Sequence, residues 1–206
     1  MGVVQTDRRM QSDTATRILD VAERLVQQRG FNGFSYADVA SELGVTKASL
    51  HYHFAGKAEL GEALIVRYAQ RFGAALAAVD AGEAAAPEKL DAYAGLYGDV
   101  LQTKRMCLCG MLAAEYGTLP EPMQAAVIRF FDENETWLES VLDAGREAGT
   151  LAFSGSARDT ARLIVSALEG AMLVARPYGD VQRFQEAANA LMGSFAGASA
   201  SATQTA

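Results

Sequence analysis

Apolar residues recur along this chain with the three- and four-residue spacing of amphipathic helices. The first stripe lies between a candidate capping residue, Asp13 or Thr14, and a stop at Gly30. Its members are Ile18, Leu19, Ala22, Leu25 and Val26. A second stripe, over 57–81, consists of Leu60, Leu64, Tyr68 and Phe72. Both patterns predict helices that bury one face.

Glycine, proline and capping residues divide the chain into about nine predicted helices. Their expected ranges are 13–29, 35–43, 46–54, 57–81, 88–103, 106–117, 121–148, 157–175 and 180–196. The predicted fold class is therefore all-α, with a three-helix head (13–56) joined by a long helix to a helical-bundle body (57–196). We expect disordered tails at 1–12 and 197–206.

Residues 35–54 have the pattern of two short helices joined by a tight turn. Ser35 and Asp38 resemble a capping box, with Asp in place of the usual Glu. Gly44 permits the left-handed backbone of the turn, and Thr46 caps the second helix. This second helix is polar where it would face DNA. The segment is predicted to be a helix-turn-helix, whose second helix enters the major groove.

The charge distribution is compatible with that prediction, although it would not have suggested it. The net charge is −7, but residues 1–57 carry a balance of +1 and residues 58–206 a balance of −8. Ionic screening over about 8–10 Å lets a near-neutral head bind DNA beside an acidic body. No apolar run is long enough to cross a membrane, and no signal peptide is evident. With two cysteines close in sequence, we expect a cytoplasmic protein without structural disulfides.

The head resembles the TetR family of transcriptional repressors. The shared run is F-x-x-F-S-x-x-D-V-A-x-x-L-G-V-T-K-A-S-L-H-Y-H-F-x-x-K-x-E-L, from Phe31 to Leu60. The resemblance implies that 13–56 binds double-stranded operator DNA and that 57–196 binds a small-molecule inducer and dimerises. It implies phosphate contacts from Ser35, Tyr36, Tyr52, His53 and Lys57, and base-edge contacts from Thr46, Lys47, Ala48 and His51. Alternatively, Tyr52 packs on the core of the head, and His51 and His53 are plain surface residues.

The last two predicted helices are the candidates for homodimerisation. Small and apolar residues follow one face of each helix, which allows close backbone approach. On the first they are Leu163, Ala167, Gly170, Ala171 and Val174, and on the second Phe184, Ala187, Ala188, Leu191, Met192 and Phe195. The same stripes also suit packing within one chain, and the two roles are not exclusive.

Aromatic and methionine side chains on the middle helices are candidates for an inducer pocket. Such stripes are usually core, but the family resemblance favours a ligand site for an apolar or planar molecule. The candidates are Tyr93, Tyr97, Met106, Cys107, Met111, Glu115, Phe131 and Trp137, with Glu169 or Arg176 as a polar anchor.

The run from Cys107 to Glu115 resembles a segment of the TetR subgroup that includes the N-ethylmaleimide-responsive repressor. In that subgroup a cysteine at the position of Cys107 senses electrophiles and oxidants. Lys104 and Arg105 lie just upstream and would favour a reactive thiolate. The alternative is that Cys107 and Cys109 are small buried apolar groups. A metal site would need further ligands, and we predict neither a metal nor a cofactor.

An enzyme is not predicted, because the sequence has no Gly-rich phosphate loop, no H-E-x-x-H motif and no nucleophile with an evident base. The rival to a DNA-binding repressor is a small-molecule-binding or scaffold protein without DNA binding. Intact polar positions at Thr46, Lys47, Tyr52 and His53 favour the repressor.

Overall fold

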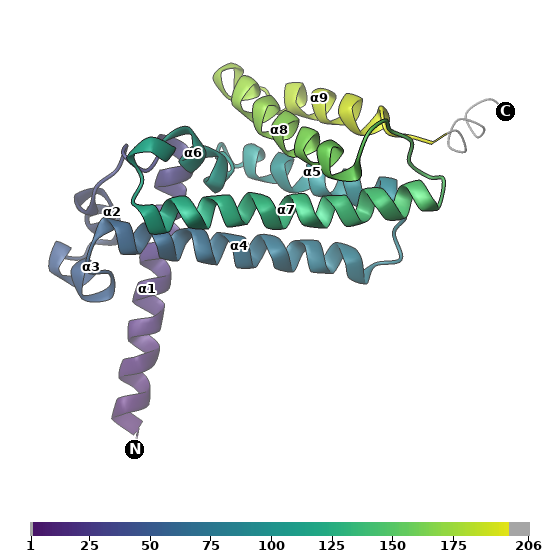
Figure 1. Cartoon of the computed structure of the whole chain (residues 1–206). Helices are drawn as coiled ribbons and strands as arrows, with labels where there is room; N and C mark the ends of the chain where they lie inside the picture. The colour runs from purple at the N-terminus through teal and green to yellow at the C-terminus, as the bar shows by residue number, and fades with distance from the viewer. Residues whose placement is uncertain (1, 198–206) are drawn as a thin grey trace. The chain divides into compact units, whose positions relative to one another are not determined.

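The computed structural model describes the backbone of residues 2–197 and the side chains of residues 13–197. Apart from two 3₁₀ turns and one isolated antiparallel bridge between Leu151 and Ala196, the secondary structure of these residues is α-helical. The nine α-helices of this range (Figure 1) confirm the predicted all-α fold class. None of the helices described is long and apolar enough to cross a membrane.

The chain divides into two compact units. The head unit comprises the residues up to Ala69 together with Leu108–Val127, and the body unit comprises Gln70–Cys107 and the residues from Ile128 onward. Two long helices, α4 (Lys57–Ala81) and α7 (Glu121–Glu147), each include a boundary between the units. The head unit is therefore larger than the predicted domain 13–56. The functional division between 13–56 and 57–196 stays a prediction.

The head unit contains α1 (Gly2–Arg29), α2 (Tyr36–Leu43), α3 (Lys47–His53), α6 (Leu108–Ala114) and the 3₁₀ turn η1 (Tyr116–Thr118). Helix α1 packs on α2 and α6, and α2 packs on α3. The stripe predicted on α1 is buried at Ile18, Ala22, Leu25 and Val26. Other buried apolar residues of this unit are Phe31, Phe34, Val39, Leu50, Phe54, Leu60 and Leu64. This close-packed core fixes the position of α3 in the head unit.

The body unit contains α5 (Ala86–Gln102), α8 (Ala157–Ala175), the 3₁₀ turn η2 (Arg176–Tyr178) and α9 (Val181–Gly193). Helix α9 packs on α5 and α8, and Figure 1 shows α8 and α9 side by side. The largest fully buried side chains of this unit include Tyr93, Tyr97 and Phe130. Its interior is therefore aromatic, with hydroxyl groups among the rings.

The N-terminal helix is longer than predicted. Helix α1 begins at Gly2, although residues 1–12 were expected to be disordered. Residues 3–12 contain neither proline nor glycine, so nothing in this segment interrupts the helix, and the polar residues at 13 and 14 continue it instead of capping it. Met1 and residues 198–206, which form most of the predicted C-terminal tail, lie outside the described residues.

Two other helices are shorter than predicted. Helix α6 starts at Leu108 instead of residue 106, because the chain first makes a turn in which Lys104 adopts a left-handed φ of 58°. Helix α9 ends at Gly193 instead of residue 196. The amide of Ala152 donates to the carbonyl of Phe195 (2.9 Å), and this extended pairing stops the helix.

Candidate nucleic-acid interface and interior site

Capping contacts build the helix-turn-helix as predicted. The Asp38 carboxylate accepts hydrogen bonds from the amide (2.7 Å) and the hydroxyl (2.6 Å) of Ser35. The Ser35 hydroxyl bond is the main reason why the pKa of Asp38 is lowered. Gly44 has φ 66° and ψ 33°, the left-handed conformation that the turn requires. The Thr46 hydroxyl accepts from the amide of Ser49 at 3.2 Å and starts α3.

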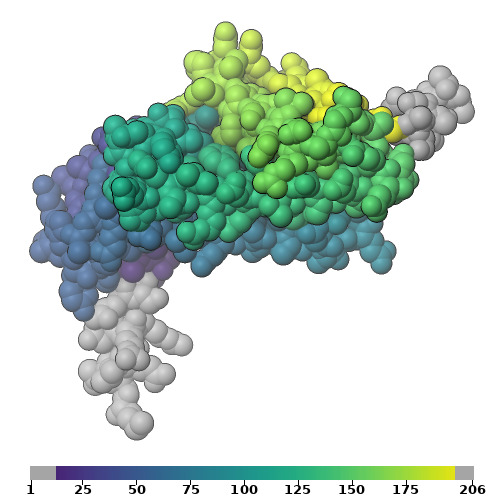
Figure 2. Space-filling view, viewed as in Figure 1, coloured from purple at the N-terminus to yellow at the C-terminus, as the bar shows by residue number. Residues whose placement is uncertain are grey.

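Helix α3 presents a polar face to the surface. Leu50 is fully buried and fixes the helix on the head core. The residues predicted to lie nearest the bases, Thr46, Lys47 and Ala48, are all exposed. In the space-filling view the atoms of this part of the chain, coloured blue, lie at the visible surface (Figure 2). A short convex helix with small and cationic side chains is the shape that enters a major groove.

The aromatic residues of the predicted interface have distinct surroundings. Tyr52 is 70% exposed and meets His53 edge-on at 5.2 Å, so it does not pack in the head core. Tyr36 donates its hydroxyl hydrogen to the carbonyl of Phe54 at 3.0 Å, and its ring lies 4.8 Å from that of His51. Burial, and secondarily Glu59, raises the pKa of Tyr36 to about 12. Tyr52 thus lies at the surface, whereas the Tyr36 hydroxyl group holds the end of α3.

Lys57 has a structural task within the head unit. Its ammonium donates to the carbonyl of Phe34 and lies 4.6 Å and 4.4 Å from the ring centroids of Phe31 and Phe34. Partial burial lowers the pKa of this ammonium, and the nearby carboxylates of Glu115 and Asp38 oppose the shift. The phosphate role predicted for Lys57 stays a prediction, now with a competing role.

Glu115 holds the turn that follows α1. Its carboxylate accepts from the amides of Phe31 (2.5 Å) and Asn32 (3.3 Å). Gly30 has φ +84°, a left-handed conformation that favours glycine, and a Cβ atom there would also lie 2.8 Å from the Glu115 Oε1 atom. The inducer-pocket role predicted for Glu115 therefore stays a prediction, now with a competing role in the head unit. The prediction assumed one continuous helix over 106–117, whereas α6 ends at Ala114 and Glu115 lies between α6 and the 3₁₀ turn η1.

The predicted pocket residues are divided between the two units. Met111, Cys109 and Glu115 belong to the head unit. The remaining candidates belong to the body unit and are Tyr93, Tyr97, Met106, Cys107, Phe131, Trp137, Glu169 and Arg176. Cys107 and Cys109 are both buried free thiols. No group of three potential metal ligands occurs in the described part of the chain.

A polar chain runs through the aromatic interior of the body unit. The hydroxyls of Tyr93 and Tyr97 lie 3.1 Å apart, and that of Tyr93 donates to Asn134 Oδ1 at 3.2 Å. Asn134 in turn donates to the carbonyl of Phe130 at 2.7 Å. Sequence reasoning missed Asn134, although a polar residue four positions after Phe130 on an apolar helix face was a usable signal. Burial raises the pKa of both tyrosines, so both are neutral.

Other predicted residues border this interior. Trp137 stacks on Tyr93 with ring centroids 5.7 Å apart, while its indole N–H donates to Asp80 at 2.7 Å. Phe131 contacts Phe130 edge-on at 5.4 Å. Because the polar group of Trp137 is already bonded, this side chain contributes an apolar wall and no free donor.

Cys107 and Glu169 form a buried pair in the body unit. Cys107 is 1% exposed, and its thiol hydrogen-bonds to the Glu169 carboxyl group. The Oε1 atom of Glu169 is buried without a hydrogen-bond partner. Burial raises the pKa of Glu169 to about 7, against the opposing effect of the Cys107 hydrogen bond. A carboxyl group with this pKa can accept or donate a proton near neutral pH, so it can exchange a proton with the thiol.

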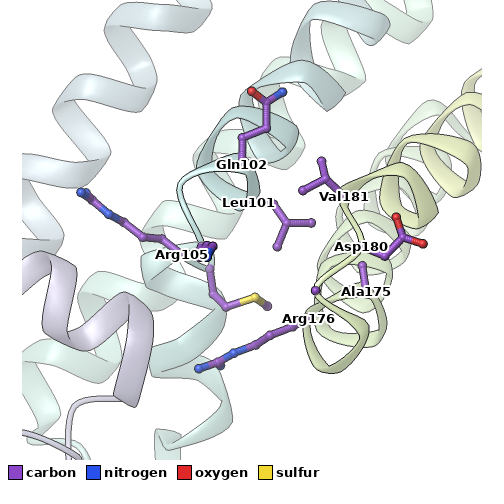
Figure 3. Close-up of a pocket in the computed structure, with 10 residues that line it drawn as sticks. Leu101, Gln102, Arg105, Ala175, Arg176, Asp180 and Val181 are labelled. Carbon is purple, nitrogen blue, oxygen red and sulfur yellow. The ribbon is translucent and has the colours of Figure 1, made fainter.

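The body unit also contains a cavity of about 450 Å³. Its lining consists of Leu101, Gln102, Lys104, Arg105, Met106, Ala175, Arg176, Gly179, Asp180 and Val181. In Figure 3 the side chains of Leu101 and Val181 point toward one another, and Arg105 and Arg176 extend toward the same side of the view. Met106 and Arg176 are the two predicted ligand-binding residues in this lining, which combines an apolar wall with cationic groups.

Comparison with known proteins identifies the family. The model described as "Bacterial regulatory proteins, tetR family" matches residues 18–64, and "Tetracyclin repressor-like, C-terminal domain" matches 86–191. The chain belongs to the TetR family. It is a DNA-binding transcriptional repressor, as the resemblance of Phe31–Leu60 predicted.

Individual relatives agree over most of the chain. The transcriptional repressor NemR of Escherichia coli (strain K12) is 27% identical over 177 residues, 82% of this chain and 87% of NemR. The solved reduced form of E. coli NemR has 26% identity and a TM-score of 0.76, covering 89% of this chain and 98% of that one. A TetR-family regulator from Agrobacterium tumefaciens has 32% identity and a TM-score of 0.87, covering 90% of this chain and 99% of that one.

Proposed function

We propose that this TetR-family repressor binds operator DNA in the cytoplasm as a homodimer and leaves the DNA when Cys107 is modified or a small molecule binds in the body unit. The observation that carries the DNA-binding part is the exposed polar face of α3. Thr46 and Lys47 lead this face, and a capped, left-handed turn at Gly44 sets its direction. Two such helices on one duplex would read two half-sites.

Exposed apolar side chains support dimerisation through α8 and α9. Leu163, Leu173 and Val174 on α8 are 54%, 61% and 54% exposed, which is unusual for large apolar residues on one helix. Gly170 lies on the same helix and allows a close approach of a second backbone. Val174→Asp should convert the protein to monomers in analytical ultracentrifugation, whereas Ala78→Asp, at an exposed position on α4 outside the proposed interface, is the control for added charge. Wild-type protein that sediments as a monomer at micromolar concentration contradicts this interface.

The packing around Cys107 supports release by thiol modification. Cys107 is only 1% exposed, so an adduct on its thiol has no room without movement of its neighbours. Modification therefore favours a conformation in which these neighbours have moved. The repressor is released if that conformation binds DNA more weakly, as a population shift requires.

The test is DNA binding before and after alkylation. Duplexes from the promoter of the protein's own gene are titrated by fluorescence anisotropy, with and without N-ethylmaleimide. We expect salt-sensitive binding that alkylation abolishes in wild type and in Cys109→Ser, but not in Cys107→Ser. A Cys107→Ser protein that still responds fully contradicts the thiol switch. Absence of DNA binding at low salt would favour the ligand-binding or scaffold alternative.

A further inference from the structure

The buried pair of Cys107 and Glu169 in the body unit contains a polar atom to which the proposed function assigns no role. The Glu169 carboxyl group forms a hydrogen bond with the Cys107 thiol. The Oε1 atom of Glu169 is buried without a hydrogen-bond partner. A buried carboxyl oxygen without a partner costs stability. A buried group of this kind is a candidate for a chemical role.

We propose that Glu169 is the proton acceptor that makes Cys107 reactive toward small, uncharged α,β-unsaturated carbonyl compounds. This inference rests on the proposed thiol response and names its activating residue. In the reaction, the Cys107 sulfur forms a bond to the β-carbon while the carbon–carbon π bond opens and its electron pair moves toward the carbonyl oxygen. The thiol proton passes to the Glu169 carboxylate and then to the α-carbon, so no other reactant is needed.

Among the titratable groups around the pair, Glu169 is the one placed to accept the proton of the Cys107 thiol. From α5, Tyr93 and Tyr97 face it, and both are neutral phenols because burial raises their pKa. From α7, Glu135 affects Tyr93 electrostatically, but its carboxylate pairs with Arg162 at 3.3 Å. Glu169, on α8, is the carboxyl group that bonds the thiol directly. The raised pKa of Glu169, about 7, matches a base that works at neutral pH.

The same surroundings set the class of electrophile. Cys107 is 1% exposed, and the phenols of Tyr93 and Tyr97 that interact with it are neutral. A charged reagent would lose most of its hydration on entering this buried site, so uncharged reagents are favoured. Access requires local opening, which favours small molecules.

The experiment measures the alkylation rate of Cys107 in the intact protein by mass spectrometry, with N-ethylmaleimide as the probe. Probe concentrations are kept where the rate is proportional to concentration, so that the chemical step and not opening is measured. For wild type we expect the rate to rise with an inflection near pH 7 and then level, because Glu169 must be ionised to accept the proton. An isolated cysteine would instead follow a pKa of about 8.5.

Two variants complete the test. Glu169→Gln should slow Cys107 alkylation at about pH 7.5 by roughly tenfold or more and remove the inflection, since general bases typically contribute about 10²–10⁴-fold and thiols retain some reactivity alone. Glu135→Gln, the matched loss of a nearby carboxylate, should keep the wild-type rate and profile. The alkylation rate of Cys109 reports global unfolding, which would expose both cysteines.

Several results would show that Glu169 is not the proton acceptor. An unchanged or faster Glu169→Gln rate, a wild-type profile without the inflection near pH 7, or an equal loss in Glu135→Gln overturns the role of Glu169. Failure of Cys107 to react in the folded protein overturns it as well. If alkylation depends on Glu169 as expected but DNA stays bound, the inference stands and the proposed thiol switch falls, so the two failures are distinguishable.

Discussion

Lys57 has two candidate roles, a phosphate contact implied by the family motif and an intramolecular contact seen in the structure. The motif implies a phosphate contact, whereas the structure shows the ammonium on the carbonyl of Phe34 and above two aromatic rings. Replacement with methionine keeps most of the stem and removes the charge. We expect Lys57→Met to destabilise the head and to leave the salt dependence of DNA binding nearly unchanged.

The magnitude follows from three contacts. A hydrogen bond from a charged donor contributes about 1.5–3 kcal/mol, and each of two cation–π contacts about 0.5–1 kcal/mol at a partly exposed site. Part of this gain is offset, because burial of the ammonium costs solvation and lowers its pKa. The net loss in the free energy of unfolding is therefore about 2 kcal/mol.

Two assays separate the roles. Denaturant unfolding gives the free energy, and anisotropy titrations over about 0.05–0.3 M salt give the slope of log Kd against log salt, which changes by about one unit per lost phosphate contact. Lys89→Met is the control, because Lys89 pairs with Asp80 in the body unit and carries the same charge. Stability unchanged within about 0.5 kcal/mol, together with a slope reduced by about one unit, would refute the structural role.

Three further predictions concern separate sites. Lys47→Ala should change the preferred operator sequence at a cost of about 1–3 kcal/mol on cognate DNA, and equal losses on cognate and scrambled duplexes would count against a base contact. Glu115→Gln should lower the free energy of unfolding by about 1–2 kcal/mol, since it weakens two charge-assisted bonds to amides, while the exposed Glu83→Gln should change it little. Wild-type stability should fall as pH rises from about 5 to about 8, because Glu169 has a folded pKa above its unfolded value and ionises more easily when unfolded; Glu169→Gln should lack this slope in denaturation measured across that range.

Local signals in the sequence were sufficient for the helices and the head. Apolar spacing predicted the stripes of α1 and α4, and the capping box at Ser35 with the glycine at 44 predicted the turn of the helix-turn-helix. These signals work because caps and turns are hydrogen bonds between residues three or four positions apart. The chain itself carries both partners of each such bond.

The missed helix boundaries also have local causes. The left-handed turn before α6 occurs at Lys104, although lysine rarely adopts this conformation. Because no glycine marks the turn, the sequence did not indicate that α6 starts late. The extension of α1 to Gly2 lacked a sequence signal of its own, because capping residues at 13 and 14 suggested a start there.

Only the tertiary structure decided which polar side chains meet. Glu115 holds the amide of Phe31, 84 residues away in sequence, and Tyr93 bonds Asn134, 41 residues away. Sequence analysis grouped Glu115 with the pocket and offered Glu169 only as one of two anchors. Periodicity shows which face of a helix is buried, but the partner across that face depends on how distant helices pack and on the burial that packing imposes. The pairing of Cys107 with Glu169, and with it the chemistry proposed for the body unit, therefore exists only in the folded chain.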